Sequence, residues 1–194
     1  MTKIVVGVRT IKILWLRCIM RHPNSLSQKW TISVRNDNTG VSRTVRMLNT
    51  NNYAQLIALM IGALSQTMTN TSGGAESLSA NAFQSVGNQF DYATPNMFAQ
   101  LGTGTTPPTR GDYNLETPIA GTTAIAFSYA TGASSMSASA AISYTTAVSP
   151  SEVGLFMNLQ NSSGSAFTTM IDHAVFNALP SGTAFTISAT IELS

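Results

Sequence analysis

Charged side chains are scarce in this sequence. Ten Lys and Arg and eight Asp and Glu make up 9% of the 194 residues, whereas soluble domains usually carry roughly a quarter. Catalytic sites usually depend on ionisable groups, so this shortage disfavours an enzyme. Hydrophobic residues make up 43% of the chain. That fraction disfavours a disordered tail and is enough for the core of one domain, or of one domain with an arm.

Cysteine and histidine are scarcer still. Cys18 is the single cysteine, so no disulfide can form within the chain. The two histidines, His22 and His173, lie far apart in the sequence. Asp172 precedes His173, but neighbouring residues of a strand face opposite sides, so these two are not expected to form a dyad. We therefore predict no catalytic residues, no metal site, no cofactor-binding residues and no cofactor.

The few charges are unevenly distributed. Nine of the ten basic residues lie in the first 46 positions beside one acid, Asp37, which gives that segment a net charge of +8. The remainder has Arg110 against seven acids, a net charge of −6. This asymmetry predicts a basic surface that meets an acidic face of another subunit, or nucleic acid, unless it is merely solvated. The residues predicted to make assembly contacts are Lys3, Arg9, Lys12, Arg17, Arg21, Arg35, Arg43 and Arg46.

Residues 4–20 are rich in apolar and β-branched side chains, but the pattern does not indicate a membrane span. Arg9, Lys12 and Arg17 interrupt the run, and one charge near the centre of a spanning helix costs about 2.5–3.5 kcal/mol on insertion scales. The β-branched composition instead favours an extended segment that could add a strand to a neighbouring subunit. We predict a basic N-terminal arm over residues 1–28 and no membrane span.

Hydrophobic periodicity predicts the other elements. Apolar and polar residues alternate on both sides of a turn at 36–40, which predicts a hairpin over residues 30–47. Helical spacing of apolar residues predicts a helix over 51–66, and the Ser/Asn/Gly-rich stretch 67–96 is predicted to be a loop. About five strands follow, and the apolar run 153–157 is typical of a central strand. The predicted fold is mainly β: an antiparallel β-sandwich over residues 29–194, of immunoglobulin-like or jelly-roll type, with one α-helix and an extended N-terminal arm.

Three short patterns need a structural interpretation. Gly102-Thr103-Gly104 has the glycine spacing of a phosphate loop but lacks its Lys-Ser/Thr ending, so we interpret it as a turn. Asn70 and Asn161 begin Asn-x-Ser glycosylation patterns, which occur often by chance. Glu152 stands at the mouth of a buried strand, where a charge needs partners to offset its desolvation. We predict that Glu152 makes structural hydrogen bonds to a loop.

The order and spacing of several motifs resemble a family of small virion or tail-associated structural proteins of tailed phages and related viruses. In this chain the motifs are Trp30–Val34, Thr50-Asn51-Asn52, Leu101–Pro108, Asp112–Glu116, Glu152–Phe156, Val175-Phe176 and Thr183–Leu193. The resemblance marks six positions as structural: Gly102, Gly104, Pro107, Asp112, Glu116 and Glu152. It covers residues 29–194, while the segment 1–28 has no counterpart and the family usually keeps more charge.

The resemblance implies a structural protein of the virion, in a tail, vertex, adaptor or connector, rather than an enzyme. The implied partners are copies of the chain itself, since closed rings are the default for such parts, and other virion proteins. The basic segment leaves contact with nucleic acid open. Two alternatives remain at this point: an extracellular adhesin or pilus-like subunit assembled by strand donation, and a DNA-contacting connector.

Overall fold

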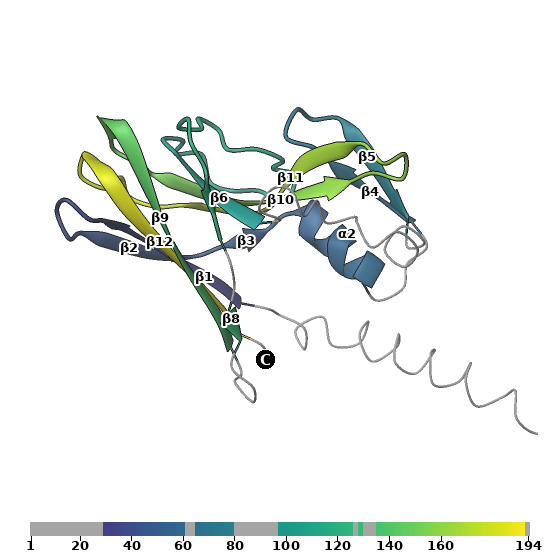
Figure 1. The fold of residues 1–194 in the computed structure, drawn as a ribbon, viewed down its shortest axis with the longest axis horizontal. Coiled ribbons are helices and arrows are strands. Elements are labelled where there is room, and N and C mark those ends of the chain that lie inside the picture. The colour runs from purple at the N-terminus through teal and green to yellow at the C-terminus, as the bar shows by residue number, and fades with distance from the viewer. Residues whose placement is uncertain (1–28, 61–64, 80–96, 126–127, 130–134, 193–194) are drawn as a thin grey trace, which may run out of the picture.

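The described part of the chain is mainly β. The computed structural model describes residues 29–60, 65–79, 97–125, 128–129 and 135–192. These residues form two five-stranded antiparallel sheets, a two-stranded hairpin and one helix (Figure 1). The predicted arm over residues 1–28 lies outside the described residues.

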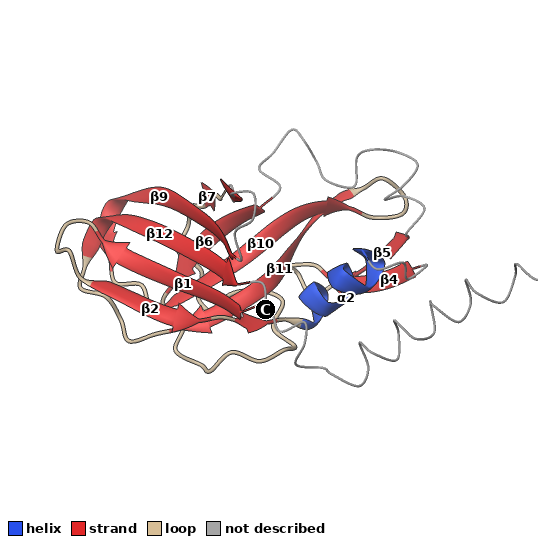
Figure 2. Ribbon diagram, turned by 90° about the horizontal axis from the view of Figure 1, so that it is seen from below, coloured by secondary structure: helices blue, strands red, loops and turns tan. Residues whose placement is uncertain are grey.

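The two sheets have different strand orders. The first sheet has the order β2-β1-β12-β9-β8, with bounds β1 Lys29–Asn36, β2 Ser42–Arg46, β8 Ser128–Tyr129, β9 Ser135–Val148 and β12 Gly182–Glu192. The second sheet has the order β3-β11-β10-β6-β7, with bounds β3 Leu48–Asn49, β6 Met97–Gly102, β7 Thr123–Ala124, β10 Glu152–Gln160 and β11 Ala166–Val175. Helix α2 (Asn51–Met60) and the hairpin of β4 (Ser65–Thr69) and β5 (Ala75–Ser79) lie together at one end of the molecule (Figure 2).

Alternating side chains from both sheets build one shared core. On β1, Trp30, Ile32 and Val34 are at most 4% exposed, and they contribute to the same apolar cluster as Val153 and Leu155 of β10. Strand β10 lies between β11 and β6 and is buried from its first residue. The predicted hairpin over 30–47, the central strand at 153–157 and the mainly β, antiparallel class are confirmed. The arrangement is consistent with a β-sandwich.

The predictions for residues 51–96 were partly wrong. Helix α2 is described as far as Met60, residues 61–64 lie outside the described residues, and Ser65 already begins β4. Within the stretch predicted to be a loop, β4 continues to Thr69 and β5 spans Ala75–Ser79, while residues 80–96 lie outside the described residues. Each of these strands has one fully buried apolar side chain, Met68 on β4 and Leu78 on β5. One apolar residue per strand does not make an alternating pattern that the sequence could reveal. No helix in the described residues is long and apolar enough to cross a membrane.

The two Asn-x-Ser segments form matching hairpin turns. Asn70 accepts hydrogen bonds from the backbone amides of Ser72 and Gly74, and Asn161 accepts them from Ser163 and Ser165. Each turn also contains a glycine at positive φ, 84° at position 73 and 85° at position 164. The two asparagine side chains both donate to the carboxylate of Glu76, at 2.9 Å. Both asparagines therefore have a structural role in joining the β4–β5 and β10–β11 turns.

Candidate functional site

The loop between β6 and β7, residues 103–122, folds over the outer face of the second sheet; we call it the carboxylate loop. Leu115 from this loop packs against Phe156 and Met170 in a second apolar cluster, apart from the main core. The loop also returns to β6, since the amide of Ile119 donates to the carbonyl of Leu101 at 2.9 Å. Its path is therefore fixed by both apolar and polar contacts.

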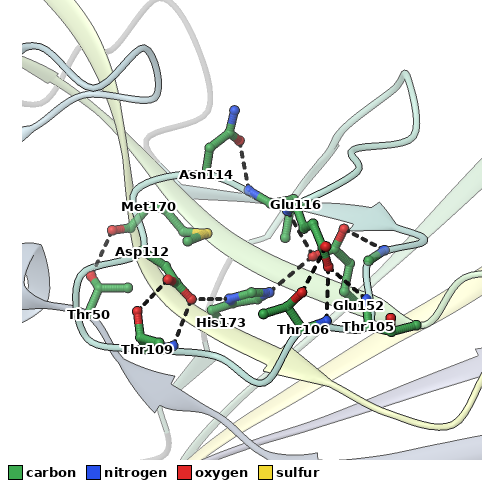
Figure 3. Close-up of polar contacts among 12 residues, drawn as sticks. Thr50, Thr105, Thr106, Thr109, Asp112, Asn114, Glu116, Glu152, Met170 and His173 are labelled. Atoms are coloured by element: carbon green, nitrogen blue, oxygen red, sulfur yellow. Dashed lines mark hydrogen bonds and ion pairs between the residues drawn. The ribbon is translucent and has the colours of Figure 1, made fainter.

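Glu152, the first residue of β10, binds the backbone of the carboxylate loop through its side chain. Its side chain is 0% exposed. Oε1 accepts hydrogen bonds from the backbone amides of Gly104 (2.9 Å) and Thr117 (2.8 Å), and Oε2 accepts one from the amide of Glu116 (3.1 Å; Figure 3). Oε2 also lies 3.1 Å from Nε2 of His173. The predicted role of Glu152 in hydrogen bonding to a loop is confirmed.

His173 on β11 lies between two carboxylates. Its Nδ1 is 2.8 Å from Oδ2 of Asp112 and its Nε2 is 3.1 Å from Oε2 of Glu152, while the residue is 3% exposed (Figure 3). Ionised carboxylates only accept hydrogen bonds, so we infer that both ring nitrogens act as donors, as they do in an imidazolium. Burial by itself lowers the pKa of His173, but the hydrogen bonds and charges of Glu152 and Asp112 outweigh it and raise the pKa above 6.5. We call Asp112, Glu152 and His173 the His173 cluster.

The carboxylates of the His173 cluster remain ionised despite their surroundings. Burial raises the pKa of Glu152, but the bond from His173 and the three backbone amides lower it by more. Burial likewise raises the pKa of Asp112, but hydrogen bonds from Thr109 and His173 bring the net pKa below its ordinary value. Asp112 accepts from the Thr109 amide at 2.8 Å and from the Thr109 hydroxyl at 2.5 Å. Opposite charges and amide donors thus replace the water that each carboxylate loses.

Glu116 holds the other side of the carboxylate loop. Its exposed carboxylate accepts hydrogen bonds from the amides of Thr105 (2.8 Å) and Thr106 (2.9 Å) and from the Thr106 hydroxyl (2.8 Å). The Thr106 amide and hydroxyl and the Thr105 amide lower the pKa of Glu116. Gly104 passes between Glu116 and Glu152, where a Cβ would lie 2.7 Å from a carboxylate oxygen of each. Glycine is therefore required at this position by close approach.

A one-residue bulge in β11 decides which side chain faces Glu152. Phe156 pairs with Met170, but Leu155 pairs with Asp172, so Ile171 has no counterpart on β10. A shift of one residue moves every following side chain to the opposite face of the sheet. The bulge therefore turns the histidine towards Glu152 and the preceding aspartate towards the core.

The Thr-Asn-Asn segment before α2 supports this bulge. The Thr50 hydroxyl donates to the carbonyls of Met170 (2.9 Å) and Ile171 (3.1 Å), and the Thr50 amide donates to Ile171 at 2.9 Å. The Asn52 side chain donates to the carbonyl of Met170 at 3.2 Å. Thr50 and Asn52 are only 2% and 3% exposed. These two side chains satisfy buried carbonyls that the irregular ladder leaves free.

Asp172 lies on the opposite face from His173, as predicted. It is 0% exposed, and neither carboxyl oxygen has a hydrogen-bond partner among the described residues. Burial raises the pKa of Asp172 well above its ordinary value of 3.8. Because an unpaired buried carboxylate is costly, burial favours the neutral form of Asp172 relative to an exposed aspartate.

The structure places the predicted site residues in three groups. One group is Glu152 with Gly102, Gly104 and Glu116 around it, and Asp112 joined to it through His173. Pro107 is exposed on the carboxylate loop, and Arg35, Arg43 and Arg46 are on β1 and β2. Lys3, Arg9, Lys12, Arg17 and Arg21 lie outside the described residues. Sequence reasoning did not select His173.

The ring of His173 is fully engaged by its two carboxylate partners. Both ring nitrogens of His173 are occupied by carboxylates, so neither can activate a nucleophile in this arrangement. In the part of the chain that the structure describes, no three His, Cys, Asp or Glu side chains are grouped to hold a metal ion. What the cluster does is fix the carboxylate loop to β10 and β11.

No family model, no curated protein and no solved structure matches the chain. The resemblance to tailed-phage virion proteins therefore stays a prediction.

The His173 cluster predicts an unfolding free energy that is greatest in mild acid. The raised pKa of His173 gives stability that is complete below about 6.5 and is lost as the pH rises through its folded pKa. The lowered pKa values of Glu152 and Asp112 give stability that is complete above about 4.3 and is lost as the pH falls through their folded pKa values. The raised pKa of Asp172 favours folding at low pH.

Urea denaturation across the pH range checks this prediction. We expect a larger unfolding free energy near pH ~5.5 than near pH ~8.5, and His173→Gln should reduce the difference because it removes the titrating ring. A wild-type curve that is flat or rises from pH ~5.5 to pH ~8.5 would contradict the imidazolium.

Proposed function

We propose that the protein is a structural subunit of a virus particle, in a tail, vertex, adaptor or connector, where copies associate through repeated contacts. The observation that carries the proposal is the separation of charge between the two sheets. The basic side chains of one copy meet the acidic part of the next copy.

The described basic residues belong mainly to one edge of the first sheet. They are Lys29 and Arg35 on β1 and Arg43 and Arg46 on β2. Strand β2 is the outermost strand, at the left of the view in Figure 1. Arg35 and Arg46 are exposed, and the guanidinium of Arg35 lies 3.7 Å from Asp37. Arg43 lies opposite the inward-facing Val34, so it places a charge on the inner face of an edge strand. Such a charge disfavours non-specific pairing of this edge with a strand of another chain.

The acidic residues gather mainly on the other sheet. Glu76, Asp112, Glu116, Glu152 and Asp172 belong to β5, the carboxylate loop and the strands of the second sheet. The distribution has three exceptions: Arg110 lies on the carboxylate loop, Asp37 lies in the turn after β1, and Glu192 lies on β12 of the first sheet. Glu152 and Asp172 are buried, so the acids that can meet another copy are Glu116, which is exposed, and Glu76 and Asp112, which are partly exposed. These three and the basic edge of the first sheet favour a head-to-tail contact, which closes into a ring when the rotation permits.

A structural role agrees with the His173 cluster, in which both ring nitrogens of the histidine already contact carboxylates. An enzyme needs an acid, base or nucleophile that can reach a substrate, and the histidine here is committed to two carboxylates. For the two sheets and their shared core, we propose the immunoglobulin-like or jelly-roll type of sandwich. The resemblance of the motif order supplies the viral context of the proposal.

Sedimentation velocity of the full chain tests the proposal. We expect an oligomer at about 0.05 M salt that dissociates towards about 0.5 M, because exposed charge contacts are screened. The double substitution of Arg35→Glu and Arg46→Glu should weaken association by at least about tenfold. Arg110→Glu is the matched control and should not weaken it. A monomer at every concentration and salt would refute the proposal.

A further inference from the structure

A polar groove lies between the carboxylate loop and the turn that joins β4 to β5. Its volume is about 430 Å³, and its lining includes Thr71 and Ser72 from the turn and Tyr113, Asn114 and Glu116 from the loop. It lies beside the His173 cluster, since Asp112 also contributes to its wall. We call it the Tyr113 groove.

Tyr113 is unusual because its ring is displayed to solvent. Tyr113 is 42% exposed, and among the described residues no other large hydrophobic side chain is exposed. The ring packs on the glycine of the turn: a Cβ at Gly73 would lie 3.4 Å from Cζ of Tyr113, and Gly73 has a φ of +84°. The turn therefore supports the ring without covering it.

The frame around the ring is preformed. The Asn114 side chain donates to the carbonyl of Thr71 at 3.3 Å and accepts from the amide of Leu115 at 2.9 Å, which joins the two walls. Asp112 is held by His173 and Thr109 (Figure 3). A site whose side chains are already fixed loses little conformational entropy when it binds a partner.

The chemistry of the groove suits a cationic side chain. An aromatic ring attracts Arg or Lys through its face, and the carboxylates of Asp112 and Glu116 add negative charge. One oxygen of each carboxylate, Oδ1 of Asp112 and Oε1 of Glu116, has a single hydrogen-bond donor and can accept another. The hydroxyl groups of Thr71 and Ser72 provide further acceptors. Arginine fits this combination best, because its guanidinium stacks on aromatic rings and carries several hydrogen-bond donors.

The segment 1–28 of this same protein carries matching charge. It contains Lys3, Arg9, Lys12, Arg17 and Arg21 and no acidic residue. When extended, 28 residues reach roughly 90 Å, enough to cross to a neighbouring subunit. Strand β1, where this segment joins the sheet, starts at the lower side of Figure 1, whereas the carboxylate loop lies at the upper side.

We propose that the Tyr113 groove receives an arginine or lysine side chain from residues 1–28 of a second copy of the chain. The inference rests on the proposed function, because it names the acceptor in the head-to-tail contact. The His173 cluster then has a purpose beyond stability: it fixes the carboxylate loop so that the groove is open before the partner arrives.

Photo-cross-linking of the full chain tests the proposal. Tyr113 is replaced by a photoreactive benzophenone amino acid, and copies labelled with nitrogen-14 and nitrogen-15 are mixed before irradiation. We expect cross-links from position 113 to residues 1–28 of a differently labelled copy. Cross-links within one copy, to β1 or β2 of another copy, or none in an intact oligomer would overturn the groove while leaving assembly itself in place. A chain that never associates would refute both proposals.

Two substitutions give an independent measurement by sedimentation. Tyr113→Ala should weaken association by about tenfold, whereas Tyr113→Phe keeps the ring face and should change it less than about threefold. Ser143→Ala, an exposed position on β9, is the control and should leave association unchanged. Equal association of the Ala and Phe variants would count against a cation held on the ring.

Discussion

Glu152→Ala is expected to lower the unfolding free energy by about 3–5 kcal/mol, the cost of breaking a buried ion pair by removing one partner. The substitution leaves the His173 imidazolium with one carboxylate, and it removes the acceptor of three backbone amides, those of Gly104, Glu116 and Thr117. Urea denaturation monitored by circular dichroism measures the change.

Two further variants separate the charge of Glu152 from its hydrogen bonds. Glu152→Gln keeps an acceptor for Gly104 and Thr117, so it should destabilise the fold less than alanine. Its loss of charge should also lower the pKa of His173. Glu192→Gln, at an exposed strand position, is the control and should change stability by less than about 0.5 kcal/mol. A stability loss below about 1 kcal/mol for Glu152→Ala would mean that the cluster does not hold the loop.

Gly104→Ala is expected to cost about 2–4 kcal/mol, although it adds one methyl group. That group would lie 2.6 Å from Cβ of Glu116 and 2.7 Å from Oε1 of Glu152, so one of the two carboxylates must move. Because Glu152 is buried, it has no free space to move into without losing amide donors. Thermal unfolding and urea denaturation measure the loss.

Gly111→Ala is the matched control for Gly104→Ala. It lies on the same carboxylate loop, but a Cβ there would meet only the Thr109 hydroxyl, at 3.8 Å. We expect a change within about 0.5 kcal/mol. If both variants lost the same stability, crowding against the carboxylates would not be the cause.

Strong alternation made the two-sheet core predictable. Trp30, Ile32 and Val34 mark one face of β1, and the apolar run after Glu152 marks β10 as central. The β4–β5 hairpin was missed because its strands each have one fully buried apolar residue between serines and threonines. Polar contacts stabilise this hairpin instead: the hydrogen bond within the Asn70 turn and the bonds from Asn70 and Asn161 to Glu76.

The candidate site was predictable in part. Burial of Glu152 required donors, so hydrogen bonds to a loop were predictable, but the sequence did not indicate which loop provides them. His173 was missed because the register of β11 against β10 decides which side chain lies on the same face as Glu152. Regular pairing would place Asp172 opposite Gly154 on the face of Glu152, and the bulge at Ile171 replaces it with His173. Thr50 and Asn52 stabilise the bulge by donating to the carbonyl of Met170. These contacts join residues far apart in the sequence, so the bulge could not be predicted from them.

The central claim is that His173 is a charged ring held between Glu152 and Asp112 so that the carboxylate loop keeps its shape. Nitrogen-15 NMR of the histidine side chains tests it most directly, because the chain has only two histidines to assign, His22 and His173. At about pH 7.5, an ordinary histidine is mostly neutral. We predict that both ring nitrogens of His173 are protonated there and titrate only at higher pH. A neutral His173 ring with one unprotonated nitrogen at that pH would contradict the account.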